Sequence, residues 1–381
     1  MSSEFSSFYQ SLQPLFVLTK TFGLFPLKLS HDASVILIYT RKELFLPIVW
    51  FFVSLAAGIC TLIGLFSAKF EDKILQAVYT AYFCFLELTA LSSITTMWIN
   101  RKKVNEIFRN LLAVDQLLDN STRLVLYKQS RSSFIKTVSF VSVFVTTVAA
   151  CFIYFHYGNS LYVMVGEITL NTMNIIFIFQ YVTIVQGVRL RYYQLWHILK
   201  TLPKEKKEVS SQMVGCCIYN SHIADTLQIS ILRDQHFNLS NVVSLLNEVY
   251  SLTILLEIVT ALSNCVGSVY EGIQILNRDE NPMESLAIIL SGALLFAPVI
   301  WMAMSCHQVD QQNEHIREIQ KLLISKSVNQ RNENELKELL LQINLMKSKF
   351  NAGGFFNLNL KFLCTSFSSI FTYIIILSQM K

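Results

Sequence analysis

The feature that most constrains this chain is a series of seven long apolar segments. They span roughly residues 43–66, 75–98, 135–157, 161–188, 244–268, 284–304 and 356–379. A helix needs about 20 apolar residues to cross the hydrocarbon core of a bilayer, and each segment is long enough. Charged residues make up only 15% of the chain, against about 25% in soluble domains. The sequence therefore predicts an all-α membrane protein with seven transmembrane helices.

The distribution of Lys and Arg predicts how these helices are oriented. The N-terminal segment and the loops on its side of the membrane hold 25 of these residues, whereas the opposite side holds four. Because Lys and Arg accumulate in cytoplasmic loops, we expect a cytoplasmic N-terminus and an extracellular C-terminus. We divide the chain into six helices with their loops (1–304), a cytoplasmic segment (305–355) and a final helix (356–381).

The long cytoplasmic loops predict a helical anchor layer next to the membrane. Residues 310–323 and 332–350 both have the spacing of an amphipathic helix, and in the second Glu333 precedes Lys337 by four residues. These helices could pack on their own chain or join subunits, and the sequence favours neither alternative.

Several classes of protein are excluded by orientation or by missing motifs. A seven-helix G-protein-coupled receptor has the opposite orientation, and its acidic-Arg-aromatic and N-P-x-x-Y motifs do not occur. Metalloprotease, nucleotide-binding and serine-hydrolase motifs do not occur either, so we expect no enzyme and no cofactor. The eight cysteines are scattered, which indicates neither a metal site nor a disulfide framework. The net charge of +5 is explained by cytoplasmic Lys and Arg, so no nucleic-acid partner is expected.

The final apolar segment carries a polar face along its length. On a helical wheel this face comprises Lys361, Thr365, Ser368, Thr372, Ile376 and Gln379. The opposing positions are Phe362, Phe367, Ile370, Phe371, Ile374 and Leu377. Such a face either packs on neighbouring helices through small polar residues or, copied around a ring, lines a water-filled pore.

The end of this segment resembles the insect gustatory receptor family. The stretch "TYIIILSQ", from Thr372 to Gln379, fits the T-Y-h-h-h-h-h-Q signature, where h is hydrophobic. The approach "GGFFNLNLKFLCTSFSSIFTY" is also similar to that family. The resemblance implies a ligand-gated, nonselective cation channel of four identical or related subunits, made in gustatory neurons and placed in the plasma membrane. It also implies that the final helix lines the pore and that the cytoplasmic layer joins the subunits.

Carried onto this chain, the resemblance makes Thr372 a pore-facing residue and Ile376, Gln379 and Met380 candidates for the gate. Tyr373 is expected to pack against a neighbouring helix. Sweet-sensing members often carry Glu directly after the motif Tyr, whereas here that residue is Ile374. We therefore expect a non-sugar, bitter-type tastant. A fructose-type receptor of the same family is one alternative, and a receptor or transporter whose last helix only packs is another.

The resemblance also implies a ligand pocket toward the outer side, among the second to sixth helices. The polar or aromatic candidates there are Gln76, Tyr79, Tyr82, Phe83, Tyr154, His156, Tyr162, Glu167, Asn171, Thr260, Asn264 and Tyr270. Three acidic residues, Glu87, Glu167 and Glu257, lie within apolar segments, where a carboxylate usually faces water, a partner or a ligand. Glu167 and His156 could form a ligand-binding pair or a structural one. Membrane lipid is the remaining expected partner.

Overall fold

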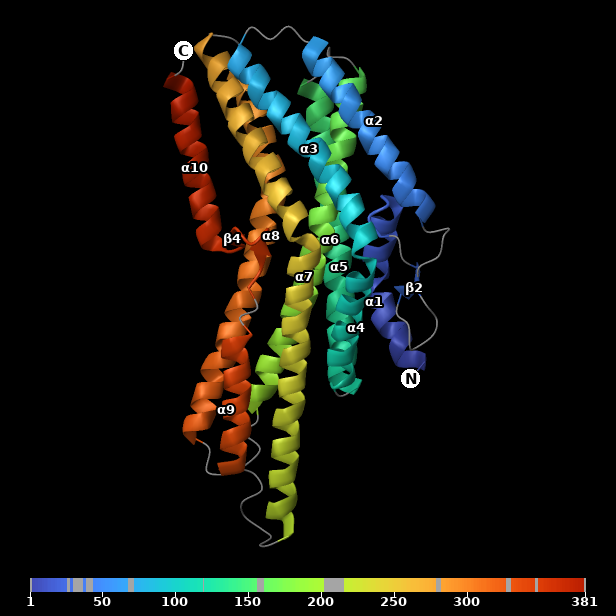
Figure 1. Ribbon diagram of the computed structural model, residues 1–381, viewed down its shortest axis with the longest axis vertical. Helices are drawn as coiled ribbons and strands as arrows, with labels where there is room; N and C mark the ends of the chain where they lie inside the picture. Colours follow the sequence, from blue (N-terminus) through green and yellow to red (C-terminus); the bar gives the residue numbers. More distant parts are fainter. Residues whose placement is uncertain are drawn as a thin grey trace.

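The computed structural model is a bundle of long helices (Figure 1). It describes residues 2–25, 28–29, 37–38, 44–67, 72–118, 120–155, 161–201, 216–278, 282–326, 330–346 and 349–379. The helices are α1 (Ser2–Thr21), α2 (Phe45–Ser67), α3 (Lys73–Ile99), α4 (Arg101–Gln116), α5 (Asn120–Phe155), α6 (Leu161–Thr201), α7 (Cys216–Asn277), α8 (Pro282–Lys326), α9 (Gln330–Leu345) and α10 (Leu360–Gln379). Two short antiparallel pairs complete the fold: β1 (Lys28–Leu29) with β2 (Leu37–Ile38), and β3 (Asn351–Ala352) with β4 (Phe356–Asn357).

Within the described residues, six helices are long and apolar enough to cross a membrane: α2, α3, α6, α7, α8 and α10. They coincide with six of the seven predicted segments. The remaining segment, 135–157, falls on the second half of α5, and its last two residues lie outside the described part. The prediction of an all-α membrane protein is confirmed. α7 extends well past the thickness of a bilayer. It has 62 residues, which correspond to about 90 Å of helix.

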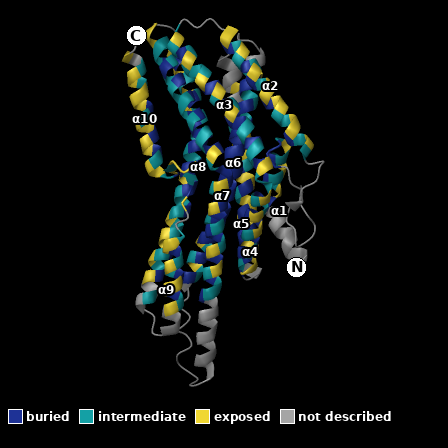
Figure 2. Ribbon diagram, in the orientation of Figure 1, coloured by how far each residue is buried: buried dark blue, intermediate teal, exposed yellow. Residues whose placement is uncertain are grey.

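The core of the bundle is centred on α6. A helix that is apolar on every side is normally buried, and α6 is largely dark blue in Figure 2, with contacts to α2, α5, α7 and α8. Phe177 and Tyr181 pack against Tyr250 of α7, with ring centroids 5.4 and 5.3 Å apart. These contacts hold α6 and α7 together near the middle of the molecule.

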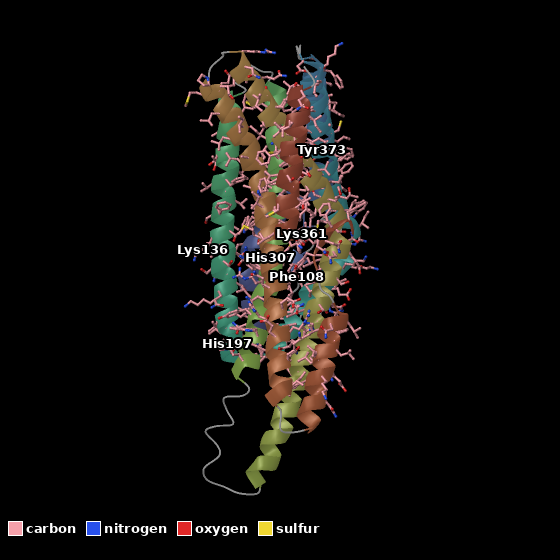
Figure 3. The ribbon with its side chains drawn as sticks, turned by 90° about the vertical axis from the view of Figure 1, so that its left-hand side faces the viewer. Phe108, Lys136, His197, His307, Lys361 and Tyr373 are labelled. Atoms are coloured by element: carbon pink, nitrogen blue, oxygen red, sulfur yellow. The ribbon has the colours of Figure 1, made fainter. Side chains whose placement is uncertain are left out.

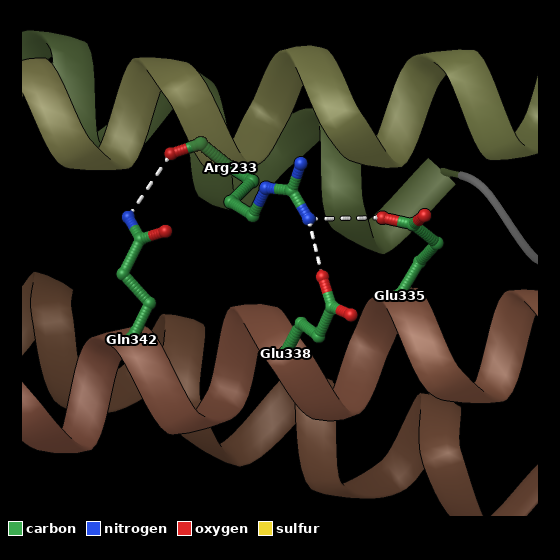
Figure 4. A network of polar contacts seen from close by, with 4 residues as sticks. All are labelled: Arg233, Glu335, Glu338 and Gln342. Atoms are coloured by element: carbon green, nitrogen blue, oxygen red, sulfur yellow. Dashed lines mark hydrogen bonds and ion pairs between the residues drawn. The ribbon is translucent and has the colours of Figure 1, made fainter.

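The lower end of the molecule in Figure 1 includes α9 and the lower parts of α7 and α8. Leu336, Leu339 and Ile343 of α9 are buried. Arg233 of α7 forms ion pairs with Glu335 and Glu338 over 3.1 and 2.6 Å (Figure 4). The predicted amphipathic helix therefore packs on its own chain. α8 continues through residues 304 and 305 without a break.

A buried ion pair joins α4 to α6. Arg191 donates from Nε and Nη2 to the two carboxylate oxygens of Asp115 over 2.8 and 2.6 Å, and the side chains are only 5% and 0% exposed. Tyr127 of α5 also hydrogen-bonds to Asp115. Burial raises the pKa of the Tyr127 hydroxyl, and the negative charge of Asp115 adds to this shift.

A short hairpin sets the start of α10. Gly353 and Gly354 have φ angles of 58° and 77°, which glycine adopts without the strain of a side chain. The Asn247 side chain of α7 bonds to the backbone on both sides of residue 350: it donates to Lys349 O over 2.8 Å and accepts from Asn351 N over 3.1 Å. Asn359 then accepts from the backbone N–H of Phe362 over 3.0 Å and caps the helix.

Candidate functional site

The final helix α10 contacts the rest of the chain along a narrow stripe. Leu363, Ser366 and Ile370 are buried, and the partners of α10 are α7 and α8. Figure 3 faces this side of the molecule, with Lys361 and Tyr373 marking the lower and upper parts of α10. Most of its surface is exposed in Figure 2.

Every residue of the predicted pore face lies on the exposed side of α10. Lys361, Thr365, Ser368, Thr372, Ile376 and Gln379 are all exposed. The positions on the opposite face differ in exposure, because Ile370 is buried whereas Phe371 is 66% exposed. Tyr373, expected to pack against another helix, is 60% exposed within this chain. Met380 lies outside the described residues.

Hydrogen bonds within the helix satisfy the two threonine hydroxyl groups on its polar face. Thr365 Oγ1 donates to Lys361 O over 3.0 Å, and Thr372 Oγ1 donates to Ser368 O over 2.9 Å. The hydroxyl oxygens still have free lone pairs, which can accept hydrogen bonds from water or solvate a cation. The exposed face is therefore chemically suited to water while needing no partner from its own chain.

A second polar feature runs between α3, α6 and α7, and we call it the polar seam. Its members are Asp72, Tyr79, Tyr82, Thr89, Ser92 and Thr96 from α3 and its N-cap, Glu167, Asn171 and Asn174 from α6, and Thr253, Glu257, Thr260, Asn264, Tyr270, Glu271 and Gln274 from α7. The three helices contact one another in pairs, and all three pass through the upper half of Figure 1.

Tyr82 is the centre of the seam. Its hydroxyl, on a side chain that is 1% exposed, donates to Glu167 Oε1 over 3.4 Å and accepts from Asn171 Nδ2 over 3.1 Å. Phe83 packs beside it, with ring centroids 5.0 Å apart. One turn higher on α3, the Tyr79 hydroxyl donates to Glu271 Oε2.

The upper end of the seam is fixed by Asp72, which caps α3. Its carboxylate accepts from Ile74 N over 2.7 Å, from the Tyr270 hydroxyl over 2.8 Å and from the Gln274 amide. Burial alone would raise the pKa of Asp72, but the bonds from Gln274, Tyr270 and the helix N-terminus outweigh burial and hold this pKa below its usual value. Asp72 thereby joins the start of α3 to α7.

Below Tyr82, hydroxyl groups pair across α3 and α7. Thr89 and Thr260 lie 3.0 Å apart between their Oγ1 atoms, and Thr253 Oγ1 lies 2.9 Å from Ser92 Oγ and 3.1 Å from Thr96 Oγ1. The seam therefore extends over most of the length of α3.

A protein-family comparison decides what kind of molecule this is. The family described as 7tm chemosensory receptor matches residues 12–381. The chain belongs to this family. The resemblance drawn from the final helix is thereby confirmed at the level of chemosensory receptors. The protein is a multi-pass receptor of the plasma membrane, from a family of receptors and not of enzymes.

Two solved structures of an insect olfactory receptor, OR5 from Machilis hrabei, are similar to this receptor. The first has a TM-score of 0.62 at 12% identity and covers 97% of this chain and 98% of that one. The second, OR5 in complex with eugenol, has a TM-score of 0.65 at 12% identity and covers 99% and 100%. At this identity the likeness shows the fold alone. No curated protein matches the receptor by sequence.

The structure brings most of the predicted ligand-binding residues of the receptor into or beside the seam. They are distributed along its length: Tyr79, Tyr82, Phe83, Glu167, Asn171, Thr260, Asn264 and Tyr270. Gln76 lies on the same helix, half-buried, and its backbone carbonyl accepts from Thr80 Oγ1. The side chains of Tyr154 and Tyr162, and the whole of His156, lie outside the described residues, so the predicted Glu167–His156 pair stays a prediction.

Sequence reasoning missed Glu271 and Asp72 of the receptor. A signal for the first was present, because Thr253, Glu257, Thr260, Asn264 and Glu271 are spaced 4, 3, 4 and 7 residues apart and share one face of a helix. Glu87 lies apart from the seam. Its carboxylate points at α2, where a Cβ on Gly58 would come within 2.1 Å of Oε2.

Two cavities of the receptor lie in the helix bundle away from the seam. One, of about 280 Å³, lies between α5, α6 and α8 and is lined by apolar side chains, including Phe144, Phe179 and Trp301. The other, of about 420 Å³, lies between α7 and α10, with Leu262, Lys361 and Thr365 among its walls. None of the predicted ligand-binding residues lines either cavity.

Proposed function

We propose that the receptor is a gustatory, ligand-gated, nonselective cation channel for a small, non-sugar tastant, with α10 lining a pore between four subunits. The observation that carries this proposal is the exposure of α10. Its six predicted pore-face residues are exposed while only a narrow stripe contacts its own chain. The partners would be three further subunits, identical or related, and the surrounding lipid.

The chemistry of α10 supports a position between a pore and neighbouring subunits. A Lys side chain in hydrocarbon costs about 2.5–3.5 kcal/mol, and Lys361 is exposed at the start of the polar face. Large apolar side chains flank that face, with Phe371, Tyr373 and Ile375 all more than half exposed. Burial of this apolar surface by adjacent copies would leave the polar face toward a common axis.

α7 supports a route from ligand to pore. One face of this helix carries Thr260 and Asn264 in the seam, whereas Leu255, Val259 and Leu262 line the cavity beside α10. A ligand that moves α3 or α6 against α7 therefore acts on the helix that supports α10. Eugenol in the complex of the olfactory relative supports a small-molecule ligand.

Ile374, which replaces the Glu of sweet-sensing members, supports a bitter-type tastant over a sugar. A fructose-type receptor is the alternative within the family. A receptor or transporter whose α10 only packs is the alternative outside the channel class.

The test is to express the full chain, alone and with related receptors, and to record currents during a screen of bitter compounds and sugars. Subunits are counted in the same membranes by photobleaching of a fluorescent tag. We expect tastant-evoked cation current from assemblies of four subunits. A monomeric receptor that signals without current would contradict the proposal.

A further inference from the structure

The cavity between α5, α6 and α8 offers an occupant almost nothing polar. Its volume is about 280 Å³, and its walls are aromatic and aliphatic side chains, among them Phe144, Phe179 and Trp301. An apolar cavity of about 150 Å³ stays free of water and binds a small apolar molecule. This larger cavity therefore favours an apolar occupant over water.

One wall of the cavity lies at the outer surface of the bundle. Phe140 of α5 lines the cavity and is 56% exposed, and Val143 on the same helix is 65% exposed. Phe140 also packs edge-to-face on Trp301 of α8, with ring centroids 5.5 Å apart. Because both α5 residues fall within the predicted span 135–157, this surface faces lipid tails, and a tail can enter the cavity from the side.

Each of the three helices around the cavity carries a basic side chain at its lower end. These residues are Lys136 on α5, Arg189 on α6 and His307 on α8. Figure 3 shows Lys136 and His307 at a similar height, and Arg189 donates to Gln308, the neighbour of His307. The predicted spans of the three helices begin at residue 135 and end at residues 188 and 304. The basic groups therefore lie at the edge of the hydrocarbon, which the distribution of Lys and Arg predicts to be the cytoplasmic edge.

This positive charge has no negative partner on the same three helices. None of the three basic side chains forms an ion pair with a carboxylate in the described part of the chain. α5 contains no Asp or Glu, and α8 has none between Glu284 and Asp310. The charge of Asp310 lies beside Lys349, and Glu167 of α6 is about 33 Å along the helix from Arg189. A negative group from outside the chain would therefore be attracted to this edge.

We propose that this cavity holds one acyl chain of an anionic phospholipid from the cytoplasmic leaflet, whose headgroup lies on Lys136, Arg189 and His307. An ammonium and a guanidinium form strong, charge-assisted hydrogen bonds with phosphate oxygens, and the imidazole adds a further N–H donor. A long Lys side chain at the end of a span reaches the headgroup region in the same way. The site is separate from the seam, which lies between α3, α6 and α7.

The α8 wall of the cavity also supports the final helix. Ala297 and Pro298 line the cavity, whereas the preceding residue, Phe296, packs edge-to-face on Phe367 of α10 with ring centroids 5.5 Å apart. A lipid chain in the cavity therefore braces the part of α8 that contacts α10. This effect on current rests on the proposed function, whereas the binding of lipid does not.

The test uses the purified full-length receptor in nanodiscs of phosphatidylcholine. The nanodiscs contain a small fraction of a phosphatidylserine probe with a photoactivatable group on one acyl chain, and peptide mass spectrometry identifies the labelled residues. A phosphatidylcholine probe with the same chains is the reference. Each basic side chain near the surface favours an anionic lipid about fivefold, so we expect cavity residues to be labelled about 5- to 25-fold more by phosphatidylserine.

Equal labelling of the cavity by the two probes would overturn the proposal, and so would label confined to other surfaces. An unlabelled cavity in a receptor whose α5 helices cross-link between two copies would also overturn it, because a second copy would then cover this surface.

Variants locate the headgroup and the chain separately. Lys136→Gln should lower the preference for phosphatidylserine about fivefold, whereas Lys128→Gln, exposed about two turns earlier on α5, is the matched control. Ala297→Leu places a larger side chain in the cavity and should remove most of the label there. Ala293→Leu, exposed one turn earlier on α8, should not. If Ala297→Leu fails to fold, the two Lys variants decide, and a preference unchanged by Lys136→Gln would overturn the proposal.

Recordings from the same protein in bilayers separate this inference from the channel itself. Tastant-evoked current from a receptor whose cavity takes no label would overturn the lipid site and leave the channel intact. Labelling that prefers phosphatidylserine and depends on Lys136, without any evoked current, would support the lipid site and contradict the channel.

Discussion

The ion pair between Asp115 and Arg191 gives the sharpest prediction about stability. Asp115→Asn keeps the volume of the side chain but removes the charge opposite a guanidinium that is only 5% exposed. Loss of one partner from a buried pair costs about 3–5 kcal/mol, because the other charge stays buried and uncompensated. We expect the lower value, about 3 kcal/mol, since an amide oxygen still accepts one hydrogen bond.

Thermal unfolding of the purified receptor measures this cost. A chain of 381 residues unfolds with an entropy of about 0.8 kcal/mol per kelvin, so a loss of about 3 kcal/mol lowers Tm by about 4 °C. Arg191→Met added to Asp115→Asn removes the uncompensated charge and should restore more than half of the loss.

The surface pair between Arg233 and Glu338 is the matched control. These atoms also approach to 2.6 Å, but Glu338 is 63% exposed, and an exposed pair contributes about 0–1 kcal/mol. Glu338→Gln should therefore lower Tm by about 1 °C or less. An equal effect of the two single changes, or a double variant no more stable than Asp115→Asn, would refute the reasoning.

Two further predictions concern packing and pH. Gly166→Ala would place a Cβ 2.9 Å from Ala57 O and 2.8 Å from Thr61 Cγ2, so it should destabilise the α2–α6 contact by about 1–3 kcal/mol. Gly187→Ala on the same helix meets only Arg191 Nη1, at 3.5 Å, and should be neutral or stabilising by up to about 1 kcal/mol; equal melting temperatures would contradict both. Because the pKa of Asp72 lies below its ordinary 3.8, its contribution to stability is present above that pH and is lost as the pH falls through the lowered value. Between pH 5 and pH 3, the Tm of the Asp72→Asn variant should therefore fall less than the Tm of the parent receptor. Parallel curves of Tm against pH for the two proteins would contradict this.

The sequence predicted the helices well because membrane spans are local. Apolar length decides each span, and the segments 43–66 and 75–98 match α2 and α3 within two residues or so at each end. The full length of α7 was not predictable in this way, since residues 216–243 and 269–277 continue the helix beyond the apolar segment. Polar residues end a span without ending a helix.

The candidate site was predictable only in part, because its contacts join distant parts of the chain. The helical wheel gave the polar face of α10, but not that Phe371 would stay uncovered while Ile370 is buried. Glu167 was found because an acid stands out in an apolar segment. Its partner Tyr82 is 85 residues away, and Glu271 meets Tyr79 across 192 residues. Nothing local in one sequence specifies such pairings.

The central claim is that α10 lines the pore, and Gln379 tests it most directly. Rings of charged side chains set permeation in cation channels, and Gln379 is exposed at the upper end of α10. We predict that Gln379→Glu raises and Gln379→Lys lowers cation conductance through single tastant-activated channels, whereas the same changes at Gln311, exposed on α8, have no effect. Unchanged conductance and ion selectivity in both Gln379 variants would contradict the claim.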